Sequence, residues 1–448
     1  MNLTEVHSVY FIGIGGIGMS NLARYFHLNG KNVAGYDKTS SEITEMLQKL
    51  DIAVTFDDSE TVIPELYLDA ANTFVVYTPA VPASHKQLCY FQDNGFTVKK
   101  RATVLGDVTK NTFCLAVAGT HGKTTTTAIL GHLLKESGVA MTAFLGGISE
   151  NYNTNFICTG TEISVVEADE YDRSFLQLFP NVACITSMEA DHLDIYGNED
   201  GIITSFNDFA KKLKPKGKMF VRYGLPLDGV TYGFEPEADY RIENILIENG
   251  SYFFDLVTPT QVLKRVEFNK PGKHNLLNAL VAFAMAIQTG SPTDRLVSAL
   301  ASFKGVRRRF SYHIQTEDVV FIDDYAHHPT EINAFHQAVR EMYPGKKVTA
   351  IFQPHLYSRT RDFAEGFATA LSQFDTVVLL DIYPARELPI KGVTSEWLLE
   401  QINCPDKMVL AKDEIIPFLQ KEKPELVATI GAGDIGNEVV KIKRALLA

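Results

Sequence analysis

The sequence lacks the segments that direct a protein to a membrane or to secretion. The N-terminal stretch "MNLTEVHSVYF" has no basic region followed by a long apolar run, so we do not expect a signal peptide. No window approaches the roughly 18 unbroken apolar residues of a membrane-spanning helix. The five cysteines are scattered without a CxxC pair, which favours buried, reduced thiols over a thiolate metal site. These absences predict a cytoplasmic protein with no membrane partner.

Positive charge is also scarce. The chain has 42 Lys and Arg against 54 Asp and Glu, which gives a net charge of -12. A general affinity for nucleic acid or for an anionic membrane surface is therefore not expected. Small anionic substrates are still compatible with this charge, because local cationic loops can act within an acidic protein.

The length and the pattern of the 448 residues indicate several α/β domains. A short apolar strand followed by a helical pattern recurs along the chain, which predicts layered α/β structure with mostly parallel sheets. We predict a Rossmann-like domain over 1–105, a P-loop ATPase-like domain over 106–303 and a second Rossmann-like domain over 304–448. The expected strands are 6–12, 32–36, 73–77, 163–166, 182–185, 319–322, 348–352, 376–380 and 426–430, with a β-rich stretch over 217–270.

The first glycine turn, "GIGGIG", follows the first expected strand. Gly13, Gly15 and Gly18 fit G-x-G-x-x-G before a helix, and Asp37 ends the next strand. Such a turn brings the backbone close to a pyrophosphate at the positive end of the helix. The same pattern recurs in "GAGDIG" at 431–436, so the pattern alone is weak. We read the first turn as a nucleoside diphosphate site and the last mainly as close packing of strand and helix.

The second glycine turn, "GTHGKT", resembles a shortened P-loop. Val117 stands where the full motif has its first glycine, so the loop begins at Gly119. Lys123 would then lie on the terminal phosphates of a nucleoside triphosphate, and the Thr124 hydroxyl on Mg²⁺. The helix that follows would add partial positive charge at its N-terminus. The alternative is an ordinary strand–helix turn.

Acidic residues after two strands could complete a magnesium site. The first group, in "EADEYDRSF", contains Glu167, Asp169, Glu170 and Asp172. The second group, in "EADHLDIYG", contains Asp191, His192 and Asp194. A metal–triphosphate complex needs such hard oxygen ligands nearby. Glu167 and His192 are the chief candidates for metal ligands, although each group alone could be a solvated turn.

The third region has two polar strand ends. "DDYAHHPTE" places two aspartates, a tyrosine and two histidines after a strand, and "QPHLYSRTRDF" contains Arg359 and Arg361. Arginines at strand ends suit bidentate recognition of a carboxylate or a phosphate. The histidine pair could bind zinc, but no Cys or further His at ligand spacing supports that reading.

Taken in order, these motifs closely resemble the Mur ligases of peptidoglycan synthesis over essentially the whole chain. The set is "GIGGIGMS", "GTHGKTTTT", "EADEYDRSF", "HLDIYG", "HNLLNALVA", "RRF", "DDYAHHPTE", "FQPHLYSRT" and "GAGDIG". The resemblance implies UDP-N-acetylmuramate in the first domain, ATP in the second and an amino acid in the third. Two phosphate cradles would thus serve two different nucleotides. The implied reaction forms an acyl phosphate from the lactyl carboxylate and ATP, which the amine of L-alanine then attacks to form an amide.

The resemblance also implies roles for individual residues. For the UDP-sugar it implies Gly13, Gly15, Gly16, Gly18, Asp37 and Thr78. For ATP it implies Gly119, Thr120, His121, Gly122, Lys123, Thr124, Thr125, Asn275, Arg309 and Asp324. For Mg²⁺ it implies Thr124, Glu167 and His192, and for the amino acid Tyr325, His327 and Arg359. Lys123, His192, Arg309 and His327 are the expected catalytic residues, with His327 acting either as an amine base or by orienting the substrate.

Two departures and three rival readings stay open at this point. Leu356 stands where many alanine-adding members have arginine, which puts more of the carboxylate binding on Arg359. Asn207 lies near the position where several sister ligases carbamylate a lysine, so we expect no carbamylated lysine. The rivals are a ligase that joins a tripeptide to the same UDP-sugar, a nicotinamide-dependent oxidoreductase and a non-catalytic ATP switch. We expect a monomer or a weak dimer.

Overall fold

The structure of the chain, a computed structural model, describes residues 6–189, 199–248, 250–385 and 387–447. It divides into two compact units. The first unit contains 1–244, 254–266 and 278–303, and the second contains 245–253, 267–277 and 304–448. Among the described residues, no helix is both long and apolar enough to cross a membrane.

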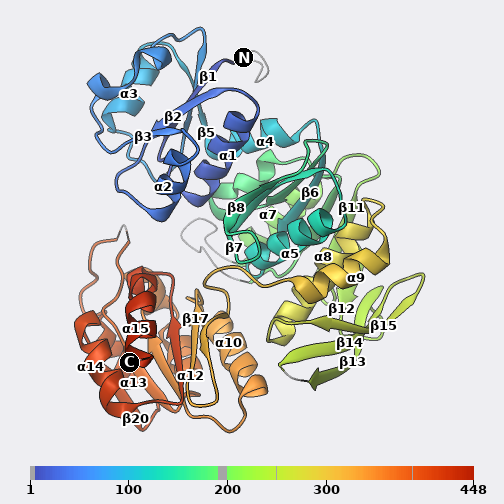
Figure 1. Cartoon of the computed structure of the whole chain (residues 1–448), viewed down its shortest axis with the longest axis vertical. Coiled ribbons are helices and arrows are strands. Elements are labelled where there is room, and N and C mark those ends of the chain that lie inside the picture. The colour runs from blue at the N-terminus through green and yellow to red at the C-terminus, as the bar shows by residue number, and fades with distance from the viewer. Residues whose placement is uncertain (1–5, 190–198, 249, 386, 448) are drawn as a thin grey trace. The chain divides into compact units, whose positions relative to one another are not determined.

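The first sheet, near the N-terminus in Figure 1, is parallel and has the strand order β3-β2-β1-β4-β5. Its strands are β1 (Ser8–Ile12), β2 (Asn32–Tyr36), β3 (Ala53–Thr55), β4 (Thr73–Tyr77) and β5 (Thr97–Lys100). Its helices are α1 (Ile17–Leu28), α2 (Glu42–Gln48), α3 (Lys86–Asp93) and α4 (Arg101–Thr109). Alternate residues of β1 explain the layering, because Phe11 packs with α1 and α2 while Tyr10 packs with α3 on the opposite face.

The second sheet has ten strands in the order β15-β14-β13-β12-β11-β10-β6-β9-β7-β8. In chain order, the first five strands of this sheet are β6 (Phe113–Ala118), β7 (Met141–Ser149), β8 (Thr154–Cys158), β9 (Ile163–Glu167) and β10 (Val182–Ile185). They continue as β11 (Lys218–Arg222), β12 (Val230–Gly233), β13 (Tyr240–Glu248), β14 (Ser251–Val257) and β15 (Val262–Phe268). The associated helices are α5 (Lys123–Glu136), α7 (Glu199–Ala210), α8 (Lys273–Ile287) and α9 (Thr293–Ser302).

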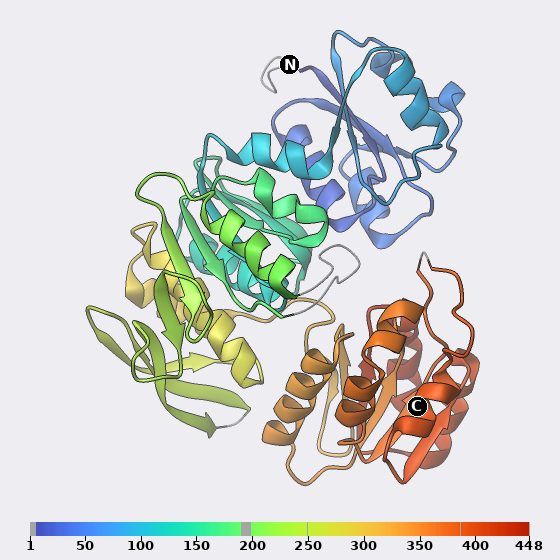
Figure 2. The same cartoon turned by 180° about the vertical axis from the view of Figure 1, so that it is seen from behind.

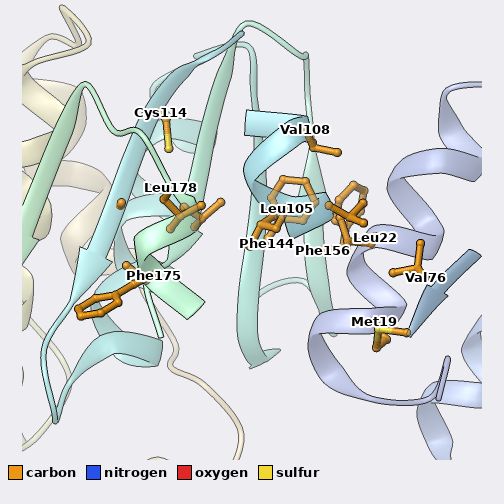
Figure 3. Close-up of a cluster of buried hydrophobic side chains, with 14 of the residues drawn as sticks. Met19, Leu22, Val76, Leu105, Val108, Cys114, Phe144, Phe156, Phe175 and Leu178 are labelled. Carbon is orange, nitrogen blue, oxygen red and sulfur yellow. The ribbon is translucent and has the colours of Figure 1, made fainter. Parts of the chain in front are cut away.

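A continuous hydrophobic core joins the first sheet to the second within the first unit. Figure 3 shows Leu22 of α1 beside Phe156 of β8, with Leu105 of α4 and Phe144 of β7 next to them. All four side chains are almost completely shielded from water. Hydrophobic burial of this kind stabilises α1 against the β7–β8 hairpin and fixes the glycine turn in front of α1 relative to the second sheet.

The third sheet lies in the second unit and has the order β16-β17-β21-β18-β19-β20. Its strands are β16 (Ser311–Gln315), β17 (Val320–Asp324), β18 (Val348–Phe352), β19 (Thr376–Leu379), β20 (Asp406–Val409) and β21 (Leu426–Ile430). Only β16 among these runs antiparallel to its neighbour. The helices are α10 (Pro329–Met342), α11 (Tyr357–Asp362), α12 (Ala364–Leu371), α13 (Ser395–Gln401), α14 (Ile415–Glu422) and α15 (Val439–Leu446).

Two separate apolar clusters cover the two faces of the third sheet. Ile322 packs with α10, α12 and α13, whereas the preceding Phe321 packs with α14 and α15. Figure 2 shows these strands between two layers of helices. The α/β class with mostly parallel sheets is therefore confirmed, and the predicted strands 32–36, 73–77, 182–185, 348–352 and 426–430 match the observed bounds.

Candidate functional site

The glycine turn after β1 lies at the point where the strand order of the first sheet reverses. In sheets of this type a ligand binds at the carboxyl ends of the strands at that point. Gly13 has φ +88°, and a Cβ there would lie 2.6 Å from Cγ2 of Thr78 at the end of β4. The backbone N–H of Gly15 donates to Oδ2 of Asp37 over 2.7 Å. The structure thus brings Gly13 close to Thr78, and the hydrogen bond from Gly15 to Asp37 closes the turn.

A cavity of about 290 Å³ lies beside this turn in the first unit. Helix α1 begins after Gly16, and no side chain caps its N-terminus, which leaves backbone donors and the positive helix end available to an anion. The cavity extends from the glycine turn to the second sheet. Its lining includes Gly16, Gly18, Thr78, Arg101, Glu167 and Asp169.

Arg101 is a lining residue that sequence reasoning missed. It is the first residue of α4, and a Cβ at Gly18 would lie 2.8 Å from its Nη1 atom. The glycine therefore leaves room for a guanidinium group directly beside the turn. No motif surrounds Arg101 in the sequence, so only the fold identifies it as a cation available for phosphate or carboxylate recognition.

The P-loop lies between β6 and α5, as predicted. Gly119 has φ +128° and Gly122 has φ +84°, conformations that favour glycine. A Cβ at Gly119 would lie 2.1 Å from Oγ1 of Thr186, and a Cβ at Gly122 would lie 2.6 Å from Oδ1 of Asn278. The loop is therefore packed tightly between the end of β10 and helix α8.

Hydrogen bonds hold the P-loop to the segment that follows β10. The Thr120 hydroxyl donates to the Glu189 carbonyl over 3.1 Å, and the Glu189 backbone N–H donates to the same hydroxyl over 3.0 Å. The His121 backbone N–H donates to the Ser187 hydroxyl over 2.9 Å. Thr124 and Thr125 lie in the first turn of α5, with Thr125 buried. These contacts hold the loop to the segment after β10.

Lys123 is held inside its own loop by the carboxylate of Glu170, a contact that the sequence motif did not predict. Its ammonium lies 2.7 Å from Oε2 of Glu170 and donates to the Gly119 carbonyl over 2.7 Å. Burial lowers the pKa of Lys123, but the carboxylates of Glu170 and Asp169 outweigh burial and hold it above its usual range. Lys123 is thus a fixed positive charge at the start of α5.

Glu167 ends β9, directly beside the P-loop strand. It pairs in register with Val117 of β6. A Cβ at Gly146 would lie 2.2 Å from its Oε2 atom, so this glycine makes room for the carboxylate. A carboxylate and the hydroxyl of Thr124 are oxygen donors of the kind that suits Mg²⁺. Residues 191, 192 and 194 and the side chain of residue 172 lie outside the described part, so the predicted role of His192 stays a prediction.

Two asparagines of α8 differ in their contacts. Asn278 lies against Gly122, as described above. Asn275 is buried, and its side-chain amide donates to the Pro271 carbonyl over 2.6 Å. This bond fixes the amide at the start of the helix, within the "HNLLNALVA" motif whose Asn275 the family resemblance assigns to ATP.

In the second unit, the polar residues predicted near the C-terminal sheet meet at the carboxyl ends of β17, β18 and β21. Asp324, the last residue of β17, accepts backbone N–H groups of Phe310 and Ala326, each over 2.7 Å. Burial raises the pKa of Asp324 to about 6, although Arg309 opposes this shift. Asp324 therefore fixes the "RRF" segment and the loop after β17 at the same time.

The two arginines before Phe310 have different surroundings. Arg308 donates to Asp323 over 3.0 Å and to the Gly431 carbonyl over 2.6 Å. Its guanidinium group therefore stabilises the fold of the second unit. Both guanidinium groups lie over the ring of Tyr325, 5.3 Å from its centroid for Arg308 and 5.1 Å for Arg309. Arg309 also lies 3.7 Å from Oε1 of Glu331. The hydrogen bonds of Arg308 to Asp323 and Gly431 are the difference that supports Arg309 as the functional arginine.

Tyr325, His327 and Arg359, the residues expected to bind the amino acid, are linked through neighbouring rings. The rings of Tyr325 and His327 are 5.4 Å apart, and those of His327 and His355 are 6.2 Å apart. Arg359 is 8% exposed, and its guanidinium lies 3.5 Å from Nδ1 of His355. Burial lowers the pKa of His327, which favours the neutral ring. Leu356 caps the short helix α11 with φ +70°.

The last glycine turn is filled by side chains of the protein itself. A Cβ at Gly433 would lie 2.2 Å from Oε1 of Gln353, and a Cβ at Gly436 would lie 2.8 Å from Cζ of Arg308. Gln353 also donates to Asp434 over 2.8 Å. The geometry favours the packing interpretation of "GAGDIG" over a phosphate site.

Three family models match successive parts of the chain. They are the Mur ligase family catalytic domain at residues 8–112, the Mur ligase middle domain at 117–286 and the Mur ligase glutamate ligase domain at 308–433. The chain belongs to the Mur ligase family. This Mur ligase is 59% identical over 446 residues to a UDP-N-acetylmuramate–L-alanine ligase of Flavobacterium psychrophilum, covering 100% of this chain and 99% of that protein. It is 48% identical to the ligase of the same name from Porphyromonas gingivalis, covering 98% of each.

Solved structures agree with the family. The UDP-N-acetylmuramate–alanine ligase MurC of Thermotoga maritima matches this Mur ligase with a TM-score of 0.81 and 28% identity, over 98% of each chain. A murein peptide ligase of Psychrobacter arcticus matches with a TM-score of 0.69 and 22% identity, over 98% of each chain. The second match bears on the fold alone.

Proposed function

We propose that this Mur ligase joins L-alanine to the lactyl carboxylate of UDP-N-acetylmuramate and converts ATP to ADP and phosphate. The observation that carries the proposal is the 59% identity, over essentially full length, to a protein named for this reaction. The geometry adds support, because one cavity extends from the glycine turn of α1 to the acidic end of β9. A UDP-sugar whose diphosphate lies at the turn would extend along this cavity.

The binding roles follow the three sheets. The turn at Gly13–Gly18 and Thr78 binds the UDP-sugar, with Asp37 supporting the turn. The P-loop at 119–125 binds ATP. Asn275 and Asp324 contribute to nucleotide binding, and Arg309 reaches its phosphates. We assign binding of the UDP-sugar to a domain over 1–105, of ATP to a domain over 106–303 and of the amino acid to a domain over 304–448. We propose that the protein acts in the cytoplasm.

The first chemical step transfers the γ-phosphoryl group to the sugar carboxylate. The carboxylate oxygen attacks the phosphorus, the bond to the β-phosphate oxygen breaks, and ADP leaves. Negative charges crowd together in this step, so the fixed charges of Lys123 and Arg309 stabilise its transition state. Glu167, Thr124 and His192 would hold Mg²⁺, which supplies further positive charge for the phosphates when bound.

The second step forms the amide bond. The amine of L-alanine attacks the acyl carbon of the acyl phosphate, and the tetrahedral intermediate collapses with loss of inorganic phosphate. Tyr325, His327 and Arg359 bind the amino acid. With Leu356 in place of the family arginine, the buried guanidinium of Arg359 is the cation assigned to the alanine carboxylate.

The test is phosphate release from Mg-ATP and UDP-N-acetylmuramate with either L-alanine or the L-Ala-γ-D-Glu-diamino acid tripeptide as acceptor. The proposal expects turnover with L-alanine. Turnover with the tripeptide alone would assign the protein to tripeptide recycling instead. Phosphate release that needs neither acceptor would favour an ATP switch, and oxidation of a nicotinamide cofactor would favour the oxidoreductase.

A further inference from the structure

The ring of His327 has two acceptors on the same nitrogen. Its Nδ1 atom lies 3.0 Å from the Tyr325 carbonyl oxygen and 3.2 Å from Oε2 of Glu331. Neither oxygen has a proton to offer when Glu331 is ionised, so Nδ1 must carry the hydrogen. In the neutral ring the lone pair is then on Nε2. The surroundings of His327 therefore select one of its two tautomers.

Glu331 has further contacts that fix its carboxylate. It lies in the first turn of α10, where its side chain is 13% exposed. The same Oε2 atom accepts the backbone N–H of His327 over 2.9 Å. The other oxygen, Oε1, lies 3.7 Å from Nη1 of Arg309. One carboxylate thus contacts a residue assigned to the amino acid and a residue assigned to the nucleotide.

We propose that Glu331 is a positioning residue that holds His327 in the tautomer whose Nε2 takes the proton from the acceptor amine. This inference rests on the proposed function, and it deepens that function by assigning the base for the second step. Glu331 lies within the "DDYAHHPTE" motif, which by itself gives this glutamate no role. A carboxylate that orients an imidazole through Nδ1 is a general device for setting ring orientation and tautomer.

The proton balance of the step is as follows. The nitrogen lone pair of the amine forms the C–N bond, and the π electrons of the carbonyl move to its oxygen. Nε2 of His327 takes one proton from the nitrogen, giving an imidazolium ring. The carbonyl then re-forms, and phosphate leaves with the electrons of the C–O bond. The imidazolium passes its proton to phosphate or solvent and returns to the starting tautomer.

Several charged and titratable groups surround His327. Burial lowers the pKa of the ring, the carboxylate of Glu331 raises it, and Arg359 and Arg309 lower it. Tyr325 contributes its carbonyl oxygen, and His355 lies beside the ring. Glu331 is the carboxylate whose contact with this imidazole stabilises the imidazolium that forms during the step.

The test compares Glu331→Gln and Glu331→Asp with the wild-type enzyme, using kcat/KM for L-alanine across pH. Glu365→Gln is a matched control, because Glu365 is an exposed carboxylate in the first turn of α12. We expect Glu331→Gln to lower kcat/KM by about 10- to 100-fold. Its acidic limb should shift to lower pH, because the ring loses the charge that raises its pKa. Glu331→Asp should recover part of the loss, and the control should match wild type.

A double-mutant cycle separates positioning from a structural role. If Glu331 acts through His327, Glu331→Gln will have little further effect in a His327→Asn background. Equal losses in both backgrounds, or an unshifted acidic limb, would overturn the inference. Wild-type enzyme without L-alanine turnover would instead remove the proposed function. ¹⁵N chemical shifts of the histidine ring provide a readout without turnover. Glu331→Gln should lower the population of the Nδ1–H tautomer of His327, because the Tyr325 carbonyl is then left without the carboxylate beside it.

Discussion

Arg101 brings a positive charge to the cavity beside the glycine turn of α1. If the diphosphate of the UDP-sugar binds there, Arg101→Ala should raise KM for the UDP-sugar by about 10-fold, the value of one good charge-assisted contact. KM for ATP should stay within about twofold. Lys49→Ala, which removes an exposed cation from the same region of the chain, is the control. Steady-state kinetics with each substrate varied in turn checks the prediction, and an unchanged KM for the UDP-sugar would contradict it.

Single residues also show where the sequence was informative. The positions of Lys123, Glu167 and Asp324 could be predicted, because each lies at the end of a strand or in the turn after it. Arg101, Glu170 and Glu331 could not be assigned. The roles of these three residues depend on the side chains that they contact. Some of those contacts join residues far apart in the chain, and the contact of Glu331 depends on the orientation of a histidine ring, which no motif encodes.

Strand β7 places Gly146 under the carboxylate that ends β9. A methyl group at this position has no room, so Gly146→Ala should displace Glu167 and weaken the binding of Mg²⁺. We expect the Mg²⁺ concentration for half-maximal activity to rise by about 10-fold, which corresponds to about 1.4 kcal/mol. Gly345→Ala is the control, because nothing lies within 4 Å of its added Cβ. The measurement is the rate of phosphate release as a function of Mg²⁺ concentration. The same half-maximal Mg²⁺ concentration for Gly146→Ala and Gly345→Ala would contradict the prediction.

Helices α5 and α9 pack through a buried histidine. Nε2 of His132 lies 2.9 Å from the Ala299 carbonyl, and Nδ1 lies 2.6 Å from the Tyr152 hydroxyl. Burial lowers the pKa of His132, while the Ala299 carbonyl and Glu136 partly offset this effect. The unfolded chain therefore binds a proton near the ordinary histidine pKa of about 6.5, whereas the folded chain binds it only at a lower pH. This histidine makes the free energy of unfolding fall as pH falls below about 6.5.

His132→Asn should remove that pH dependence. The variant should lose about 1–3 kcal/mol of stability at pH 8, because buried hydrogen bonds are lost. Its melting temperature should then fall less steeply than that of wild type between pH 7 and pH 5. Thermal unfolding at several pH values measures both effects. His7→Asn, at an exposed position, is the control, and a slope in His132→Asn as steep as in wild type would contradict the prediction.

Elements were predictable to different degrees. Strands such as 348–352 are short runs rich in apolar and β-branched residues, and their bounds match the structure. The helix after the first glycine turn ends at Leu28, directly before Asn29 and Gly30, a pair typical of turns. Neither strand of the β7–β8 hairpin was among the predicted strands, and the two strands pair antiparallel within an otherwise mostly parallel sheet. That hairpin supplies Phe144 and Phe156, which pack against α1 and α4.

At the scale of the whole molecule, the order of motifs carried more information than any one of them. "GIGGIG" and "GAGDIG" match the same pattern, yet the first turn borders a cavity and the second is filled by Gln353 and Arg308. Only the surrounding fold separates the two. The sequence could place each motif at the end of a strand, but the packing around each turn depends on side chains from other elements.

The central claim is that ATP activates the sugar carboxylate as an acyl phosphate for attack by L-alanine. It is tested most directly with UDP-N-acetylmuramate labelled with ¹⁸O in its lactyl carboxylate. The reaction with Mg-ATP and L-alanine is followed by mass spectrometry of the phosphate and the product. The account predicts one ¹⁸O atom in each released phosphate and a product that has gained one alanine residue. Phosphate without ¹⁸O, or a UDP-sugar of unchanged mass, would contradict it.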